Sequence, residues 1–305
     1  MSQYPRITLI TPSYNQGQYI EETIQSVLNQ NYPNLQYIII DGGSTDNTVD
    51  IIKKYEDRID YWVSEKDSGQ SSAINKGLKI ADGDIVNWLN SDDMLAEKSL
   101  FNLANAVKQN PSANIYTGQT TYLVHNEISN SHSHTVFENR ACTFGFGHIN
   151  QPSTYYRKQV IDKIGNLDES LNYCMDLDWW LKYLLRYDIN TVVKIMDIWS
   201  IFRIHDDSKT HLSAKKFKEE KEKVYNRVFN FYFKKDSSTI GLPEETTLDL
   251  KNAKNYYHLW QSDVSGLEKD KVQSLKHWLK VNPFKIISSQ RRRYFGVLKN
   301  LILKW

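Results

Sequence analysis

Short apolar segments alternate with segments of helical periodicity along the first 110 residues. Between the short segments, apolar residues recur three or four positions apart, as Ile20, Ile24 and Val27 do, which is the spacing of one helix face. Each short segment is bounded by turn-forming residues, as buried strands are. Four strands that each precede a helix predict a parallel sheet with right-handed crossovers. The strands are expected at residues 6–11, 35–40, 59–63 and 85–89.

The pattern loosens after about residue 112. One further helix is expected over residues 178–186, where Leu181, Leu184 and Leu185 form an apolar stripe. Residues 126–139 are polar and rich in His and Ser, which indicates a mobile loop. Further strands are expected at residues 114–118, 121–124, 151–157, 190–194 and 198–204.

From about residue 213 onward the sequence is helical in character. The charged run at residues 215–223 is typical of the solvated face of a helix that buries Val228. We therefore predict an α/β domain over about residues 1–210 and a helical region over residues 211–305. Further helices are expected near residues 248–261, 267–281 and 284–303.

Composition changes this picture little. The 305 residues carry a net charge of +2, so no global positive charge points to a nucleic-acid partner. The first residues lack the apolar segment of a signal peptide, and no run approaches the roughly 18 apolar residues of a spanning helix. We expect a cytoplasmic protein in which Cys142 and Cys174 are free thiols.

Two adjacent carboxylates, Asp92 and Asp93, follow the fourth apolar segment. The carboxyl ends of parallel strands meet at one edge of an open sheet, where ligands bind, so Asp41 and Asp67 are expected nearby. Neighbouring carboxylates repel each other unless a cation neutralises them, and Mg²⁺ or Mn²⁺ prefers oxygen ligands. The alternative is that Asp93 caps the helix expected over residues 96–107.

Motifs of several common enzyme classes are absent from the sequence. No Gly-x-Gly-x-x-Gly follows the first strand, and no Gly-x-x-x-x-Gly-Lys occurs. No Ser-centred nucleophile elbow is present either. A nucleotidyltransferase would be expected to carry a Gly-rich, basic loop after the first strand, but residues 12–17 contain no Lys or Arg. Carboxylates remain as the candidate chemistry.

Five short motifs stand in a distinctive order: TPSYN at residues 11–15, DGGSTD at 41–46, NKG at 75–77, NSDD at 90–93 and MDLDWW at 175–180. In this the sequence resembles the family-two inverting glycosyltransferases with a GT-A fold, and among them bacterial enzymes that build O-antigen or capsular polysaccharide. The likeness covers about residues 5–207. It implies an α/β fold with a mostly parallel central sheet flanked by helices, in which residues 1–110 form the nucleotide-binding half and residues 111–210 the acceptor half, followed by a helical appendage.

The resemblance also implies which residues bind the nucleotide-sugar donor. Asp41 would contact the nucleoside base, and Asp67 the nucleoside or the donor sugar. Asn90-Ser91-Asp92 takes the place of the family's metal-binding Asp-x-Asp signature, with Asn as a departure at the first position. The metal, Mn²⁺ or Mg²⁺, would be held by Asp92, Asp93 and His205. The full set expected at the donor is Thr11, Pro12, Ser13, Tyr14, Asp41, Asp67, Asn75, Asn90, Ser91 and Asp92.

The reaction implied is a displacement at the anomeric carbon of a nucleotide sugar, expected to be a UDP-sugar, by a hydroxyl of a saccharide or lipid-linked saccharide. A hydroxyl needs a base to take its proton. Asp176 occupies the family's catalytic-base position, although Met175 stands where a Glu is usual. One such displacement inverts the anomeric centre. The acceptor region is expected at Gln151, Trp179 and Trp180.

Local sequence alone leaves other roles open for several of these residues. Asp41 could cap the helix that follows it, and Asp176 or Asp178 could cap the helix that contains the two tryptophans. Trp179 and Trp180 fit a protein core as well as an acceptor platform.

A second function class is a catalytically inactive nucleotide- or sugar-binding module on the same fold. The presence of Asp41, Asp92, Asp93 and Asp176 together argues against it. His205 stands beside two aspartates, a setting that also fits an ordinary surface residue.

The last 25 residues are basic and contain no Asp or Glu. A basic amphipathic helix is typical of a membrane-surface element, which predicts peripheral association with the inner face of the plasma membrane. The alternative is that the apolar face packs on the preceding helices. The basic residues are Lys285, Arg291, Arg292, Arg293, Lys299 and Lys304; the apolar face carries Tyr294, Phe295, Leu298, Leu301, Ile302 and Trp305.

Overall fold

A computed structural model describes residues 4–125, 127–135, 138–205, 214–235, 242–267 and 270–303 of the chain. The chain forms two compact units that interleave along the sequence, whereas the sequence predicted one boundary near residue 210. Unit 1 contains residues 1–135, 149–179 and 190–225, and unit 2 contains residues 136–148, 180–189 and 226–305.

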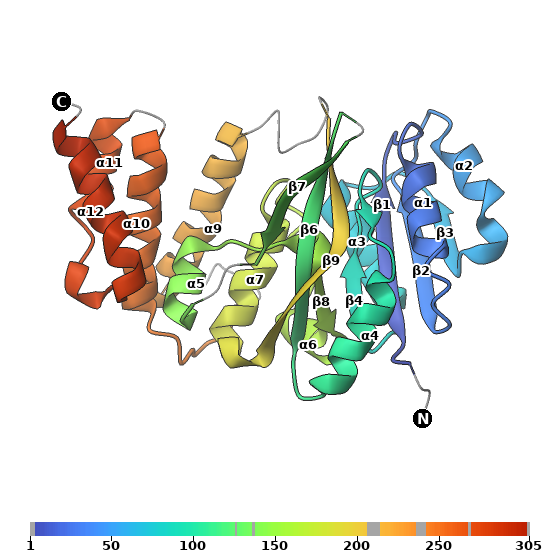
Figure 1. Ribbon diagram of the computed structural model, residues 1–305, viewed down its shortest axis with the longest axis horizontal. Coiled ribbons are helices and arrows are strands. Elements are labelled where there is room, and N and C mark those ends of the chain that lie inside the picture. Colours follow the sequence, from blue (N-terminus) through green and yellow to red (C-terminus); the bar gives the residue numbers. More distant parts are fainter. Residues whose placement is uncertain are drawn as a thin grey trace. The chain divides into compact units, whose positions relative to one another are not determined.

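Unit 1 is built on a mixed β-sheet whose first half is parallel (Figure 1). The strands of this half are, in spatial order, β3 (Tyr61–Ser64), β2 (Leu35–Asp41), β1 (Ile7–Ser13) and β4 (Ile85–Trp88). Ile10 of β1 lies between Ile38 of β2 and Trp88 of β4. The buried, apolar segments of β1, β2 and β4 favour strands that are covered on both faces, whereas β3 at the edge of the sheet is partly exposed. The parallel sheet predicted from the sequence is therefore confirmed.

The second half of the sheet is mixed in direction. It continues through β8 (Thr154–Arg157), β6 (Ile115–Val124), β9 (Val192–Ile204) and β5 (Met94–Leu95). The sequence predicted two short strands in place of β6 and two in place of β9, but each is one strand with irregular register. Gly118 permits this, because a Cβ atom there would lie 2.4 Å from the Trp199 ring.

Residues 127–134 form a strand, β7 (Glu127–His134), so the mobile loop predicted over residues 126–139 is wrong for this segment. The backbone of β7 pairs antiparallel with β6. The Thr121 hydroxyl also donates to the Ser129 carbonyl, at 2.9 Å. A strand that pairs on one side only needs backbone partners rather than an apolar face, which is why its polar side chains concealed it.

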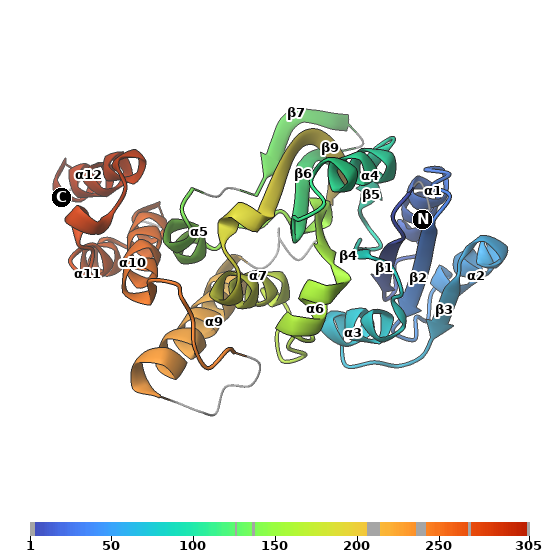
Figure 2. The same ribbon diagram turned by 90° about the horizontal axis from the view of Figure 1, so that it is seen from below.

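Helices cover both faces of the sheet in unit 1, with α1 and α4 on one face and α3 and α6 on the other (Figure 2). The apolar faces of α1 and α4 pack with Ile7 and Leu9 in one core cluster. Gly77 lets α3 approach β1 closely, since a Cβ atom there would lie 2.6 Å from the Ile10 side chain. The helices are α1 (Ile20–Leu28), α2 (Thr48–Lys54), α3 (Gln70–Ile80), α4 (Ser99–Gln109) and α6 (Lys158–Ile164), with 3₁₀ turns η1 (Glu56–Arg58), η2 (Gln151–Ser153) and η3 (Ile189–Thr191).

The C-terminal region is helical, as predicted. Its elements are α10 (Leu250–Leu267), α11 (Lys271–Trp278), η4 (Pro283–Lys285) and α12 (Ser288–Leu303). Unit 2 also contains α5 (Arg140–Phe146), a helix that the sequence did not predict, while α7 (Met175–Arg186) and α9 (Ala214–Lys234) run from unit 1 into unit 2. None of the described helices is long and apolar enough to span a bilayer.

The apolar face of α12 packs within unit 2. Tyr294 stacks on Trp278 of α11 with ring centroids 4.9 Å apart, and Leu301 is buried. These residues therefore pack on the preceding helices, which is the alternative to membrane binding that the sequence left open, while Phe295 remains 57% exposed. The side chain of Ile302 and all of Lys304 and Trp305 lie outside the described residues.

Candidate active site

The carboxyl ends of the parallel strands bring the predicted donor residues to one edge of the sheet. Ser13 ends β1 and pairs with Asp41, which ends β2. Asp67 approaches the turn after β2, because a Cβ atom on Gly42 would lie 3.0 Å from its carboxylate. Asn90 follows β4, the other neighbour of β1. The parallel topology thus assembles residues as far apart in the sequence as Ser13 and Asn90.

Asp41 is fully buried and holds the turn that follows β2. One of its oxygens accepts hydrogen bonds from the backbone N–H groups of Gly43 (3.1 Å) and Ser44 (2.8 Å) and from the Ser64 hydroxyl (2.6 Å). The Ser44 hydroxyl donates to the other oxygen. Helix α2 begins at Thr48, after Asn47, so Asp41 does not cap it. Its contact with a nucleoside base stays a prediction.

The end of β1 offers two groups that could meet a ligand. The Ser13 hydroxyl is buried and has no hydrogen-bond partner among the described residues, and Tyr14 beside it is 59% exposed. Thr11 and Pro12 are buried in the strand, and the Thr11 hydroxyl lies 3.2 Å from that of Tyr37. Thr11 and Pro12 therefore shape this edge, while Ser13 and Tyr14 present polar groups to it.

Asn90, the departure from the family signature, links two other residues of the edge. Its Oδ1 accepts from the Gln70 side-chain amide at 2.8 Å, and its Nδ2 donates to Asp93 at 3.3 Å. An Asp at position 90 could not donate to the Asp93 carboxylate and would repel it. Asn at position 90 is thus compatible with the buried carboxylate of Asp93. On the loop before α3, Asp67 accepts the Gly69 N–H at 2.8 Å.

Asn75, predicted to bind the donor, is buried and uses its polar atoms inside the protein. Its Nδ2 donates to the Leu167 carbonyl and to Glu169, both at 3.0 Å, and its Oδ1 accepts the Leu167 N–H at 3.0 Å. These bonds tie α3 to the loop before α7. Asn75 therefore holds that loop, and its contact with a donor stays a prediction.

Asp92 and His205 form a pair beside β4. The Asp92 Oδ2 lies 3.1 Å from Nε2 of His205, and the two side chains are 25% and 12% exposed. The ring of Tyr19 packs on His205 with centroids 4.5 Å apart. His205 is therefore not the isolated surface residue that local sequence allowed, and its carboxylate partner is the one in the signature position.

Asp93 faces the interior. Its Oδ1 accepts the Arg203 N–H at 3.1 Å, and burial together with the Asp92 charge raises the pKa of Asp93 well above its usual range. Asp93 does not cap the following helix, because β5 intervenes and Lys98 takes the N-cap position of α4. Ser91 is also buried, and its carbonyl accepts the Thr23 hydroxyl at 2.9 Å.

Arg203 braces this part of the edge and was not singled out from the sequence. Its Nε donates to the Asp92 carbonyl at 3.1 Å, and its guanidinium also contacts Glu22. The guanidinium lies 5.1 Å from the Tyr19 ring centroid. Only its place two residues before His205 at a strand end could have signalled this role.

Only some of the side chains predicted to coordinate a divalent metal are placed at this edge so that they could do so. Asp92 and His205 are partly exposed, and a carboxylate with an imidazole matches Mn²⁺ better than Mg²⁺, which prefers oxygen ligands. Asp93 is turned inward, so its predicted part as a direct ligand would require its side chain to move. Within the described part of the chain no three His, Cys, Asp or Glu side chains form a metal cluster, and Asp206 and Asp207 lie outside that part.

Asp176 lies in the first turn of α7, which begins at Met175. Burial raises the pKa of Asp176 to about 6, against the effect of the Leu177 N–H, which donates to its Oδ1 at 2.8 Å, and of Lys221. Burial also lowers the pKa of Lys221 to about 8. The structure therefore places a half-buried carboxylate, poised to change protonation near neutral pH, at the position of the predicted base.

Glu220 of α9 holds the backbone that leads into Asp176. Its carboxylate accepts the N–H groups of Asn172 (2.9 Å), Tyr173 (2.6 Å) and Cys174 (2.6 Å). The sequence placed Glu220 on a solvated helix face, but it satisfies the N–H groups just before α7. Nothing in the local sequence distinguishes Glu220 from its charged neighbours.

The three residues predicted for the acceptor region are all buried. The Gln151 amide donates to the Asn87 side chain (3.1 Å) and the Trp88 carbonyl (2.8 Å). Trp179 packs against Trp88 and donates to a backbone carbonyl, and Trp180 stacks on a tyrosine of its own helix. These side chains pack inside the protein, and the location of the acceptor region near them stays a prediction.

Comparison with known proteins places this arrangement in a class. TarS of S. aureus, residues 1–349 in complex with UDP-GlcNAc, superposes with a TM-score of 0.65 over 97% of this chain and 88% of that chain, at 16% identity. The mannosyltransferase PcManGT from Pyrobaculum calidifontis, solved with GDP-Man and Mn²⁺, gives a TM-score of 0.51 over 100% of this chain and 89% of that chain, at 15% identity. The fold is that of GT-A glycosyltransferases.

The sequence comparison defines the family. The model described as Glycosyl transferase family 2 matches residues 8–166, more than half of the chain, and the chain belongs to that family. Among its relatives, the putative teichuronic acid biosynthesis glycosyltransferase TuaG of Bacillus subtilis (strain 168) is 40% identical over 117 residues, which cover 37% of this chain and 46% of TuaG. The relatives of this glycosyltransferase thus include proteins of bacterial surface polysaccharide synthesis.

Proposed function

We propose that this protein transfers a sugar from a nucleotide-sugar donor, in the first instance a UDP-sugar, to a hydroxyl of a saccharide or lipid-linked saccharide acceptor, with inversion of the anomeric centre. The observation that carries the proposal is the assembly of Asp41, Asp67 and the Asp92–His205 pair at one edge of the sheet, together with half-buried Asp176 in the first turn of α7. Burial raises the pKa of Asp176 to about 6, which suits a base. A catalytically inactive binding module would need no such base. The UDP-GlcNAc complex of TarS supports the choice of nucleotide, and the relation to TuaG supports a polysaccharide acceptor.

Asp176 acts as the general base in this proposal. A base with a pKa just below the working pH is mostly ionised and can still accept a proton with little energetic penalty. Burial supplies that tuning, because it disfavours the charged carboxylate, while the Leu177 N–H and Lys221 keep the shift moderate. The proton of the acceptor hydroxyl passes to Asp176 as the hydroxyl oxygen attacks the anomeric carbon and the bond to the nucleoside diphosphate breaks.

The donor lies at the strand-end edge in this proposal. Asp41 and its turn, the Ser13 hydroxyl and exposed Tyr14 present groups for the nucleoside, and Asp67 lies beside them. Asp92 and His205 would hold a divalent ion, Mn²⁺ in preference to Mg²⁺. When bound, the ion supplies positive charge to the departing diphosphate. Arg203 keeps the Asp92 backbone and Asp93 in place for this.

Peripheral membrane association belongs to the same proposal and rests on the exposed side of α12. Arg291, Arg292 and Lys299 are exposed, as is Phe295, whereas Tyr294, Val297 and Leu301 are buried. Anionic lipid attracts each nearby basic side chain by about 1 kcal/mol. Pelleting with phosphatidylglycerol vesicles at low salt should be lost in Arg291→Gln/Arg292→Gln and retained in the wild type. Equal pelleting of the two proteins would show that Arg291 and Arg292 of α12 do not bind the membrane.

A donor screen tests the proposed reaction. The melting temperature should rise with UDP-sugars more than with GDP- or dTDP-sugars, and the rise should depend on Mn²⁺. The preferred donor is then offered with a panel of saccharides, and nucleotide release is followed together with the new glycosidic bond. Binding of a donor without transfer to any saccharide or lipid-linked saccharide would favour the inactive module. No binding of any nucleotide sugar would reject both.

A further inference from the structure

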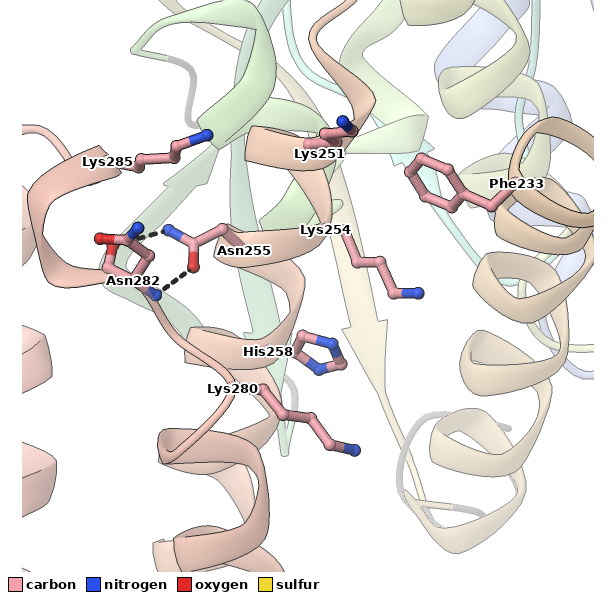
Figure 3. A pocket seen from close by; sticks show the side chains of 8 residues that line it. All are labelled: Phe233, Lys251, Lys254, Asn255, His258, Lys280, Asn282 and Lys285. Atoms are coloured by element: carbon pink, nitrogen blue, oxygen red, sulfur yellow. Dashed lines mark hydrogen bonds between the residues drawn. The ribbon is translucent and has the colours of Figure 1, made fainter.

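Unit 2 contains a cavity of about 390 Å³ that the proposed reaction does not use (Figure 3). It lies beside α10, and Phe233 of α9 faces it from the opposite side. The lining residues are Phe233, Lys251, Lys254, Asn255, His258, Lys280, Asn282 and Lys285. They come from three segments of unit 2, namely the end of α9, α10, and the stretch between α11 and α12.

The charged side chains that line this cavity in the described part of the chain are all positive. They are four lysines, and no Asp or Glu is among the described lining residues. No ion pair joins any of these lysines to an acidic group among the described residues. Lys254 instead faces the rings of Phe229 and Phe233, at 5.3 and 5.1 Å from their centroids. By contrast, Arg293 of the same unit pairs with Asp263 at 2.9 Å. Like charges gathered without a counter-charge repel one another until an anion joins them.

A pair of asparagines fixes the geometry of the cavity. The N–H of Asn282 donates to Oδ1 of Asn255 at 2.6 Å, and Nδ2 of Asn255 donates to the Asn282 carbonyl at 3.1 Å. Asn255 is buried in α10, so the two bonds clamp the segment after α11 to that helix (Figure 3). The backbone that carries Lys280 and Lys285, on either side of Asn282, is thereby fixed beside α10. This backbone is ordered before any ligand arrives, which removes that part of the entropic cost of binding.

Burial and the nearby positive groups both lower the pKa of His258. Burial lowers its pKa to about 3, and His277, Lys280 and Lys254 lower it further in that order. Its Nδ1 lies 3.2 Å from Nδ1 of His277, so a neutral tautomer of one ring donates to the other. Figure 3 shows His258 between Lys254 and Lys280, with all three side chains directed to the same space. The lysines therefore carry the positive charge of the cavity at neutral pH.

We propose that this cavity binds a phosphate-bearing ligand of the diphosphate or phosphodiester class. Lysine ammonium groups bind phosphate as point charges, and several of them around one anion match a multiply charged group. The volume lies within the usual range for small-molecule sites and exceeds what a diphosphate alone fills. The surplus space accommodates the sugar or polyol to which the phosphate is attached. The phosphate is that of a soluble phosphorylated compound or of a lipid headgroup.

Pyrophosphate is the probe for the test, titrated calorimetrically into the full chain in the presence of EDTA so that no metal-bound diphosphate contributes. Lys254→Gln/Lys280→Gln should weaken binding by about tenfold or more, because two charge-assisted contacts are lost. The matched control is Lys108→Gln/Lys276→Gln, which changes the net charge equally through two exposed lysines outside the cavity and outside α12. The control should bind pyrophosphate within about twofold of the wild type.

Two results would overturn the proposal: no pyrophosphate binding by the wild type, or equal weakening in both double variants. If Lys254→Gln/Lys280→Gln proves unfolded by circular dichroism, Lys280→Gln/Lys285→Gln replaces it, since both side chains are exposed. Asp92→Asn should retain the binding, which separates this site from the proposed donor site. Displacement by phosphatidylglycerol vesicles, but not by phosphatidylcholine vesicles, assigns the ligand to a headgroup; no displacement by either assigns it to a soluble compound.

Discussion

Replacing Glu220 with Gln should disturb the candidate base without touching it. The Glu220 carboxylate accepts three backbone N–H groups, two of them on one oxygen at 2.6 Å. The amide of Gln keeps one acceptor oxygen and sets an N–H₂ group against the remaining donors. A hydrogen bond to a charged acceptor contributes about 1.5–3 kcal/mol, so losing one or two of them lowers the free energy of unfolding by about 2–4 kcal/mol.

Turnover should fall as well, because the backbone that Glu220 holds runs directly into Asp176. A misplacement of about 1 Å at a reacting group costs about 100-fold in rate, so a decrease in kcat of about 10-fold or more is expected. The donor KM should stay unchanged, since the donor residues lie at the ends of β1, β2 and β4. This split between kcat and KM separates a positioning role from general unfolding.

The assay combines thermal unfolding by circular dichroism with initial rates of nucleotide release. The melting temperature of Glu220→Gln should drop by about 5–15 °C, given about 2–4 °C per kcal/mol for a domain of this size. Glu219→Gln is the matched control, because Glu219 is exposed and pairs at 3.9 Å with Lys215, which is exposed as well. Such a surface pair contributes little to stability. If both variants keep the wild-type melting temperature and kcat, the reasoning about Glu220 is refuted.

Three further predictions follow from the same structure. The pH profile of kcat/KM should fall below about pH 6 with unit slope, because protonation of Asp176 removes the base; a flat profile down to pH 5 would exclude this. Asp92→Asn should lower Mn²⁺-dependent turnover by at least about tenfold while leaving the melting temperature without ligand unchanged; full activity of this variant in EDTA would show that Asp92 holds no metal. In urea unfolding, Gly118→Ala should lower the free energy of unfolding by about 1–3 kcal/mol, because the new Cβ atom meets Trp199. Gly296→Ala in α12 should raise it by about 0.5–1 kcal/mol, because a Cβ atom there meets nothing within 4 Å. The reverse order of the two variants would contradict the packing.

The parallel half of the sheet was predictable because its strands are continuous apolar runs separated by helical periodicity. Placing Asp41, Asp67 and Asp92 at one edge needed only the rule that parallel strands end together. The polar strand β7 escaped detection because its place depends on backbone pairing with β6 and not on an apolar face. Periodicity carries no signal for such a strand.

The supporting residues of the site were not predictable. Glu220 and Arg203 act through contacts with segments that are 46 to 48 and about 110 residues away in the chain. Long-range partners of this kind leave no local spacing to recognise. The acceptor region was expected at Gln151 and the two tryptophans of α7, and the burial of all three could not be read from the sequence. Motifs thus located the edge of the sheet, whereas burial and hydrogen bonding decided what each side chain does there.

The central claim is that Asp176 is the general base of a sugar transfer, and its most direct test is the turnover of Asp176→Asn. With the donor identified by the screen, kcat for transfer should fall by about 100-fold or more, a typical general-base contribution, while the donor KM and the melting temperature stay close to those of the wild type. Asp162→Asn, an exposed aspartate paired with Lys158 on α6, controls for the loss of a carboxylate. Near-normal turnover of Asp176→Asn would contradict the account.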